Sequence, residues 1–417
     1  MLYTGCIADD FTGAGDAASF LRKGGLKTVY VSGERLGDYS PADDVEAIVI
    51  ALKCRSIPAA EAVQQTTEAC RWLLARGAQH IYYKYCSTFD STPAGNIGPV
   101  TDALMKLCGT AYTVLCPALP VNGRTVRDGV LYVGGVPLAE SPMRFHPLNP
   151  MTESEIPKLM AAQSRWPSHA LCLTDLYEPE DALREKLSAW CAESEGFTLS
   201  VDYCEDRDGA RIAALFGCLP LLTGGSGLLE HLGHVYKPQT AAGDREDAPL
   251  IRDGARLLLA GSCSEMTRKQ IGRYMEAGGS AVKVEPLQLL DGRQTVEGLC
   301  ARIDRAGEDL LFYSSDTAEQ VAANQKLGAE RISALLESTM GQLAAYAARQ
   351  GYTRIVVAGG ETSGRVMQAL GYDVFEILED AAPGVPRMVP VEKRSLSLVL
   401  KSGNFGDENF FLTALKE

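Results

Sequence analysis

The C-terminal segment of the chain contains one pattern twice: a short, continuously apolar stretch, a turn of Gly and Ser, and a helical stretch. The first copy is Ile355–Ala358 followed by Gly359–Gly364, and the second is Leu396–Leu400 followed by Ser402–Asp407. Continuous apolarity is typical of strands that are covered on both faces, as in parallel sheets. Glycines let a backbone approach a ligand closely, and the free N–H groups at a helix start attract anions. The pattern therefore predicts a parallel α/β sheet with a phosphate-binding edge, although such turns also follow strands in α/β folds that bind nothing.

A third turn of small residues follows the apolar stretch Arg256–Ala260. Ser262 and Glu265 fit a capping box, which predicts that a helix begins there and runs to about Ala277. Further along, Ala318–Gln350 predicts a long helix with a break, and Pro383–Pro386 predicts a rigid turn before the final strand. Three such turns in one part of the chain indicate a nucleotide-binding domain.

The first half of the chain alternates apolar stretches with helical ones. We expect strands at 3–8, 26–31, 45–52, 81–85, 113–117, 170–175, 196–202 and 220–224, and helices at 12–21, 59–75, 100–107 and 228–231. Residues Lys237–Ala248 are polar and aperiodic and contain Pro and Gly, which is the composition of an interdomain connection. A length of 417 residues also favours two domains. The prediction is an α/β protein of two domains, 1–238 and 249–417, each a mainly parallel sheet flanked by helices.

Two carboxylates, Asp9 and Asp10, directly follow the first strand. Ligands of open α/β sheets bind at the carboxyl ends of strands. Paired carboxylates there could bind sugar hydroxyls, hold Mg²⁺ through its waters, or accept a proton from a reacting hydroxyl. Asp10 or Thr12 could instead cap the following helix, and one residue can serve both purposes.

Polar and basic side chains lie at or after the ends of two further strands of the first half. Lys84 precedes the hydroxyl-rich stretch 87–92, in which Ser87 is the first hydroxyl. This combination suits a small polar anion, since the ammonium supplies charge and the hydroxyls supply direction. Arg124 is a candidate for a carboxylate-binding fork. A plain loop and a surface ion pair are the competing interpretations of these residues.

The overall charge and the cysteines exclude several classes of protein. The formal net charge is −13 and no basic run offsets it, which argues against nucleic acid as a partner. The twelve Cys stand singly, without zinc-ligand spacing, and no stretch is apolar and long enough for a membrane span. The N-terminus enters a strand without a signal peptide, so we expect a cytoplasmic protein with reduced thiols. A homo-oligomer is left open.

Familiar nucleotide motifs are missing from the sequence. There is no G-x-x-x-x-G-K-[ST], no G-x-G-x-x-G after the first strand, and no H-R-D or D-F-G set. Gly13–Asp16 matches the G-A-G-D of ribokinase-like sugar kinases, but it follows the first strand instead of lying late in the chain. We interpret that match as a coincidence.

Taken in order, the motifs resemble the four-carbon acid sugar kinase family. They lie at 7–14, 84–92, 117–124, 359–363 and 401–406 and span nearly the whole chain. The resemblance implies an N-terminal domain that binds a sugar acid, a C-terminal domain that binds ATP, and an active site in the cleft between them.

The second motif indicates a branch of that family. Many members have Ser-Thr-Leu-Arg-Gly there, with the Arg reading the sugar acid, whereas this chain has Asp90 at the position of that Arg. The form Cys86–Thr92, together with 116–125, resembles the 3-oxo-tetronate kinase branch. Its members phosphorylate the terminal hydroxyl of a 3-oxo four-carbon acid such as 3-dehydro-L-erythronate or its D isomer. Lys84 or Arg124 would then have to bind the carboxylate.

The resemblance also implies roles for individual residues. ATP contacts would come from Ser262 or Ser264, from Gly360, Glu361, Thr362 and Ser363, and from Gly403; the sugar acid would contact Asp9, Asp10, Lys84, Ser87 and Arg124. Asp10 would accept the proton of the C4 hydroxyl while Mg²⁺ bridges the phosphates, and the metal ligands stay unassigned. A D-threonate or D-erythronate 4-kinase, a sugar-acid oxidoreductase and a non-catalytic sensor remain the alternatives.

Overall fold

A computed structural model describes residues 1–416 apart from 34–35, 37–38, 146–148, 238–253, 307 and 317–327. The chain separates into two compact units, Met1–Gly243 and Asp244–Glu417. The predicted connection falls almost entirely on residues outside the described ones, and the domain limits 1–238 and 249–417 stay predictions. No helix among the described residues is both long and apolar enough to cross a membrane.

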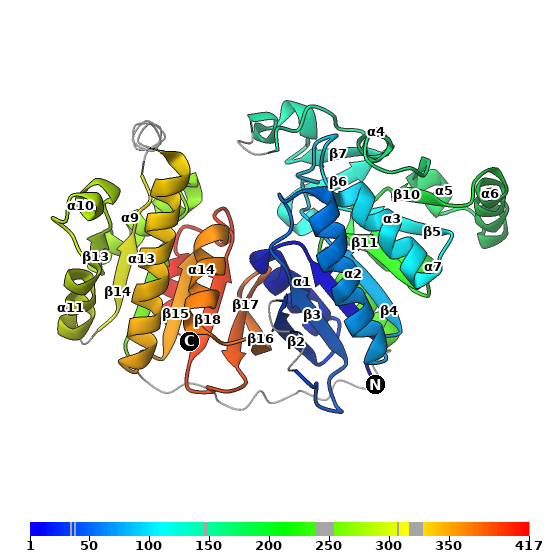
Figure 1. Ribbon diagram of the computed structural model, residues 1–417. Coiled ribbons are helices and arrows are strands. Elements are labelled where there is room, and N and C mark those ends of the chain that lie inside the picture. Colours follow the sequence, from blue (N-terminus) through cyan, green and yellow to red (C-terminus); the bar gives the residue numbers. More distant parts are fainter. Residues whose placement is uncertain are drawn as a thin grey trace. The chain divides into compact units, whose positions relative to one another are not determined.

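The first unit, coloured blue to green in Figure 1, is built on eight parallel strands in the order β2-β3-β1-β4-β11-β5-β10-β9. The strands are β1 (Thr4–Ala8), β2 (Thr28–Ser32), β3 (Ala47–Ala51), β4 (His80–Lys84), β5 (Tyr112–Cys116), β9 (Ser168–Leu171), β10 (Phe197–Val201) and β11 (Leu221–Gly224). The helices are α1 (Phe11–Lys23), α2 (Ala59–Ala75), α3 (Ile97–Cys108), α4 (Ile156–Ala161), α5 (Leu173–Leu176), α6 (Glu180–Glu193), α7 (Asp206–Phe216) and α8 (Leu229–Tyr236). Every residue of β1, β2 and β3 is buried, as expected for strands covered on both faces.

A small antiparallel sheet of the first unit was not predicted from the sequence. It consists of β6 (Arg124–Arg127), β7 (Val130–Val133) and β8 (Val136–Pro137). Its strands are two to four residues long and only partly buried, so they leave a weak apolar pattern.

The second unit has five parallel strands, β13-β14-β12-β15-β18, extended by the antiparallel β17 and β16. The strands are β12 (Arg256–Ala260), β13 (Ser280–Lys283), β14 (Leu310–Tyr313), β15 (Arg354–Ala358), β16 (Val374–Ala382), β17 (Val385–Pro390) and β18 (Ser397–Lys401). The helices are α9 (Glu265–Glu276), α10 (Pro286–Leu290), α11 (Val296–Ala306), α13 (Ala329–Arg349), α14 (Gly360–Leu370) and α15 (Phe410–Lys416). The α/β class and the mainly parallel sheets are as predicted.

The repeated C-terminal pattern forms neighbouring elements. β15 pairs with β18 in parallel, with Ala358 opposite Lys401, and every residue of both strands is buried. A core cluster from one face of this sheet, including Val356 and Val399, packs against Phe410 and Phe411 of α15. The carboxyl ends of β12, β15 and β18 therefore lie side by side at one edge of the sheet.

Three details of the second unit differ from the predictions. The residue that caps α9 is Ser264, whose side chain accepts from the N–H of Thr267, so the capping box of Ser262 and Glu265 is wrong. The turn Pro383–Pro386 joins the antiparallel β16 and β17 and does not lead into the final strand. Residues 317–327 of the predicted long helix lie outside the described residues, and the described helix begins at Ala329.

The strand predicted at 170–175 in the first unit is wrong in its second half. β9 ends at Leu171, and Leu173–Leu176 forms the short helix α5. The Asp175 carboxylate accepts from the N–H of Cys172, which begins a helical turn in place of a longer strand.

Candidate functional site

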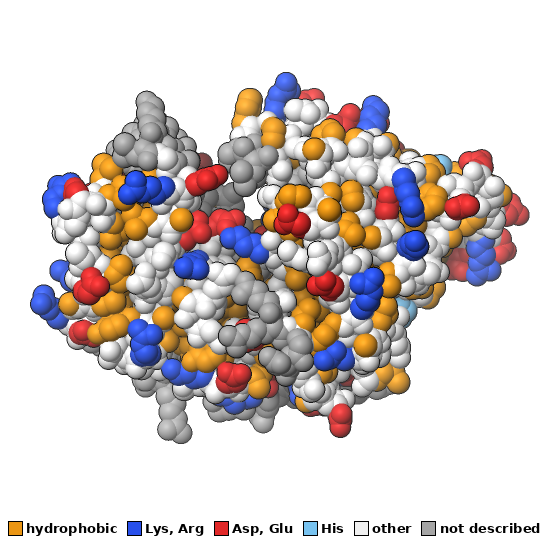
Figure 2. All heavy atoms as spheres, viewed as in Figure 1, with side chains coloured by type: hydrophobic (Ala, Val, Ile, Leu, Met, Phe, Trp, Pro, Cys, Tyr) orange, Lys and Arg blue, Asp and Glu red, His pale blue; other side chains and the backbone are white. Residues whose placement is uncertain are grey.

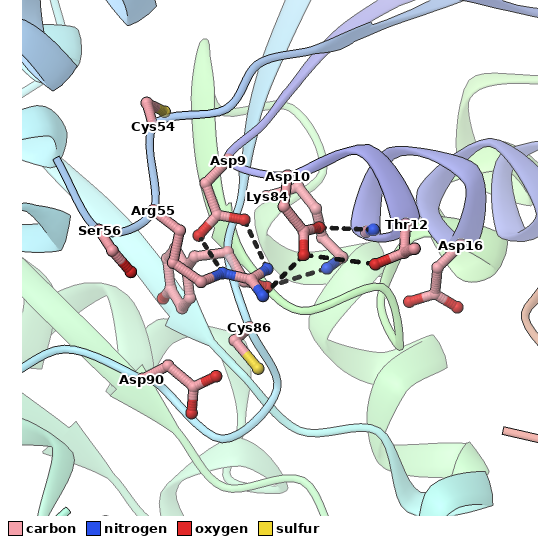
Figure 3. A network of polar contacts seen from close by, with 12 residues as sticks. Asp9, Asp10, Thr12, Asp16, Cys54, Arg55, Ser56, Lys84, Cys86 and Asp90 are labelled. Carbon is pink, nitrogen blue, oxygen red and sulfur yellow. Dashed lines mark hydrogen bonds and ion pairs between the residues drawn. The ribbon is translucent and has the colours of Figure 1, made fainter. Parts of the chain in front are cut away.

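The strand order of the first unit brings charged residues from three distant segments together. β1 lies between β3 and β4, so the residues that follow these three strands share one edge of the sheet. The N–H of Asp9 donates to the carbonyl of Lys84 at 3.0 Å, and the N–H of Cys54 donates to the carbonyl of Asp9 at 2.9 Å. These backbone bonds align the chain after β1 with the chain after β3 and β4, and Figure 3 shows Asp9, Asp10, Arg55 and Lys84 gathered there.

Arg55 joins the two candidate carboxylates. Its Nε and Nη2 donate to the two oxygens of Asp9 at 2.9 and 2.7 Å, and its Nη1 lies 2.8 Å from Oδ2 of Asp10 (Figure 3). Burial raises the pKa of the Asp9 carboxyl, while Arg55 acts in the opposite direction. Burial would lower the pKa of Arg55, but the charges of Asp10 and Asp9 hold that pKa well above its usual value. The guanidinium therefore stays charged and orients both carboxylates.

Asp10 is at once a helix cap and a ligand candidate. Its Oδ1 accepts from the N–H of Gly13 at 2.6 Å, and its Oδ2 accepts from the hydroxyl of Thr12 at 3.3 Å. The side chain is 25% exposed, compared with 3% for Asp9. Asp10 thus keeps solvent access while three neighbours, Gly13, Thr12 and Arg55, determine its orientation, whereas Asp9 is enclosed.

Lys84 completes the charged cluster, which comprises Asp9, Asp10, Arg55 and Lys84, and Gly13 lies against it. Lys84 is buried and its ammonium donates to the carbonyl of Tyr85 at 2.9 Å. A Cβ added to Gly13 would clash with Oδ1 of Asp10 and would lie 3.2 Å from Nζ of Lys84 and 3.6 Å from Nη2 of Arg55. The absence of a side chain at Gly13 therefore lets the Asp10 carboxylate and the two cations approach the start of α1 closely.

The hydroxyl-rich loop after β4 is held by its own side chains. The Thr88 hydroxyl donates to Oδ1 of Asp90 at 2.7 Å, and Phe89 and Asp90 have positive φ angles of 61° and 21°. Backbone conformations of this kind are uncommon outside glycine and are retained mostly at functional sites. Ser87 is half-buried in the same loop. Asp90, at the position where many members of the resembled family have an Arg, is bonded within its loop and supplies no positive charge.

Asn96 links this loop to the Arg55 segment. Its Nδ2 lies 2.8 Å from the carbonyl of Cys54, 3.2 Å from that of Arg55 and 3.1 Å from that of Ile57. One buried amide thus positions the whole segment that presents the guanidinium. The structure does not bring Arg124 into the charged cluster: among the described residues, Arg124 donates through Nη1 to the carbonyl of Asn122, in its own turn.

The three turns of the second unit pack on one another. A Cβ added to Gly261 would clash with the hydroxyl of Thr362, and one added to Gly359 would lie 3.0 Å from the N of Ser262. One added to Gly403 would clash with the Ser262 hydroxyl. The turns after β12, β15 and β18 therefore pack so closely that no side chain fits at these three glycines without displacing a neighbour.

These turns line a pocket of about 260 Å³. Of the predicted ATP residues, Ser262, Gly360, Glu361, Thr362 and Gly403 line it, and Leu336, Glu337 and Met340 of α13 form another wall. Ser264 is the cap of α9 and Ser363 is fully buried behind the turn, so both support the pocket without lining it. The first turn of α14, which begins at Gly360, presents backbone N–H groups there, a favourable environment for phosphate.

Gly359→Ala should weaken ATP binding by about tenfold or more and destabilise the second unit by about 1–3 kcal/mol. Gly359 has a φ of 125°, where a side chain is strained, and the added methyl would press on the Ser262 turn. Isothermal titration with ATP and urea unfolding measure the two effects.

Gly272→Ala is the matched control for this substitution. Gly272 lies in the middle of α9, and an added Cβ meets nothing within 4 Å. The change should stabilise the protein by about 0.5–1 kcal/mol and leave ATP binding unchanged. Equal ATP affinity in G359A and G272A would contradict the role of the Gly359 turn.

One group of potential metal ligands lies outside both sites. Among the described residues, ligand atoms of Asp128, Cys172 and Asp202 lie within 4.8 Å of one another. Asp202 already accepts from the N–H groups of Asp128, Gly129 and Leu173 at 2.8, 3.0 and 3.2 Å. These hydrogen bonds between turns account for the cluster without a metal.

Sequence reasoning missed several residues of these sites. Arg55 comes shortly after the predicted strand 45–52, and Lys84 lies at the end of the predicted strand 81–85, so the position of Arg55 was a usable signal. Leu336, Glu337 and Met340 recur at helical spacing on α13, but nothing in that period shows that the face borders a pocket. Lys401 belonged to a motif already singled out, yet no role was assigned to it.

The fold and the two sites define a class: an α/β protein in which one unit carries a charged cluster at a strand edge and the other carries a pocket of glycine turns. Family models match both parts, a sugar-binding N-terminal domain over residues 4–232 and a nucleotide-binding C-terminal domain over residues 257–411. The chain belongs to the four-carbon acid sugar kinase family, as the motifs predicted.

Curated relatives are similar over the full length. The chain is 40% identical to the 3-oxo-tetronate kinase of Pseudomonas savastanoi pv. phaseolicola, over 99% of this chain and 96% of that protein. It is 43% identical to the 3-oxo-tetronate kinase of Salmonella typhimurium, over 100% and 99%. A crystal structure of a Haemophilus influenzae protein matches with a TM-score of 0.79 and 38% identity, covering 98% of both chains. The predicted branch is thus the one named for the Pseudomonas and Salmonella relatives.

Proposed function

We propose that this chain is a 3-oxo-tetronate 4-kinase, which transfers the γ-phosphoryl group of ATP to the C4 hydroxyl of a 3-dehydro-erythronate in four-carbon acid sugar catabolism. The full-length similarity to relatives named 3-oxo-tetronate kinase carries the assignment of activity. The observation that carries the residue roles is the cluster in which Asp10, Arg55 and Lys84 gather around Gly13. We place the reaction in the cytoplasm.

The sugar acid would bind at the charged cluster. Lys84 is the cation available to the substrate carboxylate, because the guanidinium of Arg55 already donates to Asp9 and Asp10. Ser87 would add a hydroxyl contact, and Asp9 would act by holding Arg55. Arg124 is the weaker candidate for the carboxylate, since its described bond lies within its own turn.

Asp10 would accept the proton of the C4 hydroxyl. Its carboxylate is oriented by the N–H of Gly13 and by Arg55, and it keeps enough exposure to contact a substrate. A base within hydrogen-bond reach of a reacting hydroxyl removes the proton as the new P–O bond forms. Fixing that carboxylate before the substrate arrives lowers the entropic cost of the encounter.

The pocket of the second unit suits the phosphates of ATP. It offers backbone N–H groups at the start of α14 and the hydroxyls of Ser262 and Thr362, and side chains larger than glycine at 261, 359 or 403 would crowd it. ATP, when bound, supplies the phosphoryl group. Glu361 and Glu337 line the same pocket and are the carboxylates that would hold Mg²⁺, directly or through its waters.

The testing experiment is ATP consumption by the purified protein, with Mg²⁺, across 3-oxo-tetronates, threonates and erythronates. Turnover with a 3-oxo acid alone would support the proposal. Turnover with hydroxy acids alone would retain the kinase and reject the branch, giving a D-threonate or D-erythronate 4-kinase. ATP binding without turnover on any compound would favour a sensor, and reduction of NAD would favour an oxidoreductase.

A further inference from the structure

A lysine is buried at the end of β18, directly behind the pocket of the second unit. Lys401 has no exposed surface. Val399 and Lys401 share a face of β18 because they are two residues apart, and Val399 packs against α15 on that face. Nζ of Lys401 accordingly lies 5.8 Å from the ring of Phe410 on α15. Its Nζ donates to the carbonyl of Gly403 at 2.9 Å, and Gly403 lines the pocket. Only the backbone of Gly403 thus lies between this ammonium and the pocket.

The carbonyls that Lys401 contacts do not depend on it. Gly403 O also accepts from the hydroxyls of Ser264 at 2.7 Å and Thr267 at 2.8 Å, and Ser402 O, which lies 3.2 Å from Nζ, accepts from the N–H of Phe405 at 3.1 Å. Removing the ammonium would leave both carbonyls hydrogen-bonded. The hydrogen bonds that the turn needs therefore do not explain why a lysine is buried here.

Among the residues that the structure describes, no acidic side chain offsets the charge of Lys401. From α9 the Thr267 hydroxyl faces Nζ at 3.2 Å, from α15 the Phe410 ring does, and no carboxylate of the described residues forms an ion pair with it. Burial accordingly lowers the pKa of the Lys401 ammonium to about 7. An unpaired buried cation costs free energy unless an anion is supplied from outside.

We propose that Lys401 is a positioning residue for the bound nucleotide: from behind the Ser402–Gly403 turn, its ammonium provides the positive charge that holds the phosphates in the pocket. The inference rests on the proposed nucleotide-binding function. The phosphates would be the missing anionic partner, and the turn would be drawn toward α9 so that its N–H groups stay turned to the ligand. The chain thereby reaches a cationic pocket despite having no P-loop lysine.

The test is Lys401→Met, which keeps the length of the side chain and removes its charge. ATP affinity should fall by about tenfold or more, because a charge pair in a poorly solvated site is strong, whereas adenosine affinity should stay within about twofold. The melting temperature should stay the same or rise, since an apolar side chain replaces a buried unpaired charge. Titration calorimetry and circular dichroism measure these three quantities.

A second measurement follows the protonation of Lys401 when ATP binds. At about pH 8 much of Lys401 is neutral in the free protein, and phosphates beside it would favour its charged form, so ATP binding should take up protons from the buffer. Calorimetry in two buffers of different ionisation enthalpy measures that uptake. Glu337 and Glu361 line the pocket and could also bind protons, so the uptake that K401M loses relative to the unaltered protein is the part assigned to Lys401.

Lys393→Met is the matched control. Lys393 precedes β18 at its opposite end and its ammonium donates to the carbonyl of Ala348 at 2.9 Å, at the end of α13. ATP affinity should be unchanged in K393M. The Lys401 proposal is overturned if K401M binds ATP as tightly as K393M, or if ATP and adenosine weaken alike together with a lower melting temperature. A folded, unaltered protein that binds no ATP would instead overturn the proposed function itself.

Discussion

Asp10→Asn is expected to lower kcat by about a hundredfold or more while the protein stays folded. Asn caps helices as well as Asp does, so the bond to the N–H of Gly13 that begins α1 can persist. What the change removes is the carboxylate that would accept the C4 proton, along with the charge that faces Arg55. Steady-state ATP turnover with a 3-oxo-tetronate measures kcat, and thermal unfolding measures the state of the fold.

The control for this change is Asp181→Asn. Asp181 lies in the first turn of α6 and its side chain is 93% exposed, so the same chemical change there should leave kcat unaltered. If D10N turned over at nearly the rate of D181N, Asp10 would be a helix cap only. A loss confined to KM would also count against a proton acceptor, since that role belongs to the transition state.

Arg55→Met is expected to destabilise the first unit by about 3 kcal/mol, because it leaves the enclosed Asp9 carboxylate without its bidentate partner. The figure is taken at the low end of the range for broken buried pairs, since the Arg55 side chain is 24% exposed. Urea unfolding monitored by circular dichroism measures the free energy of unfolding. Catalysis should also fall sharply, because Asp10 loses the same guanidinium.

The double variant Asp9→Asn with Arg55→Met separates this charge effect from lost packing. If the cost arises from an unpaired carboxylate, the double variant should be more stable than R55M alone by about 1–2 kcal/mol. If it is less stable than R55M, packing of the Arg55 side chain is the larger contribution and the charge argument is wrong.

The pH dependence of R55M provides a further check on the same pair. Burial raises the pKa of Asp9 in the folded protein, and the variant loses the arginine that opposes this rise. A carboxyl whose folded pKa exceeds its unfolded value stabilises the fold at low pH and loses that contribution as pH rises through the folded pKa. R55M should therefore be less destabilised, relative to the unaltered protein, at about pH 5 than at about pH 8.

Much of the architecture follows from local patterns that a sequence displays directly. Continuous apolar runs such as Ile355–Ala358 identify strands buried on both faces, and the glycines after them indicate sharp turns at one edge of a parallel sheet. The helix Ala59–Ala75 has the limits that its period predicts. These features depend on residues a few positions apart, which is why they could be inferred without the fold.

Other local details depended on a choice between two candidate residues or two strand pairings, which the sequence leaves open. Ser262 and Ser264 are two residues apart and both suit a cap, but only Ser264 accepts from the N–H of Thr267. The hairpin of β16 and β17 was missed because Pro383–Pro386 resembles any rigid turn. The antiparallel arrangement depends on how β17 pairs with β18, with Met388 opposite Leu398, and not on the turn itself.

By itself the sequence determined the α/β class, the strand-end position of Asp10 and Lys84, the three glycine turns and the family to which the motifs belong. Only the tertiary structure decided that Arg55 joins Asp9 to Asp10, that α13 supplies a wall of the pocket, and that Lys401 lies buried behind Gly403. The physical reason is the order of the strands. Parallel pairing brings the carboxyl ends of β3, β1 and β4 together, and those of β12, β15 and β18, across long stretches of chain. That order is set by packing of the whole sheet, which no short stretch of residues encodes.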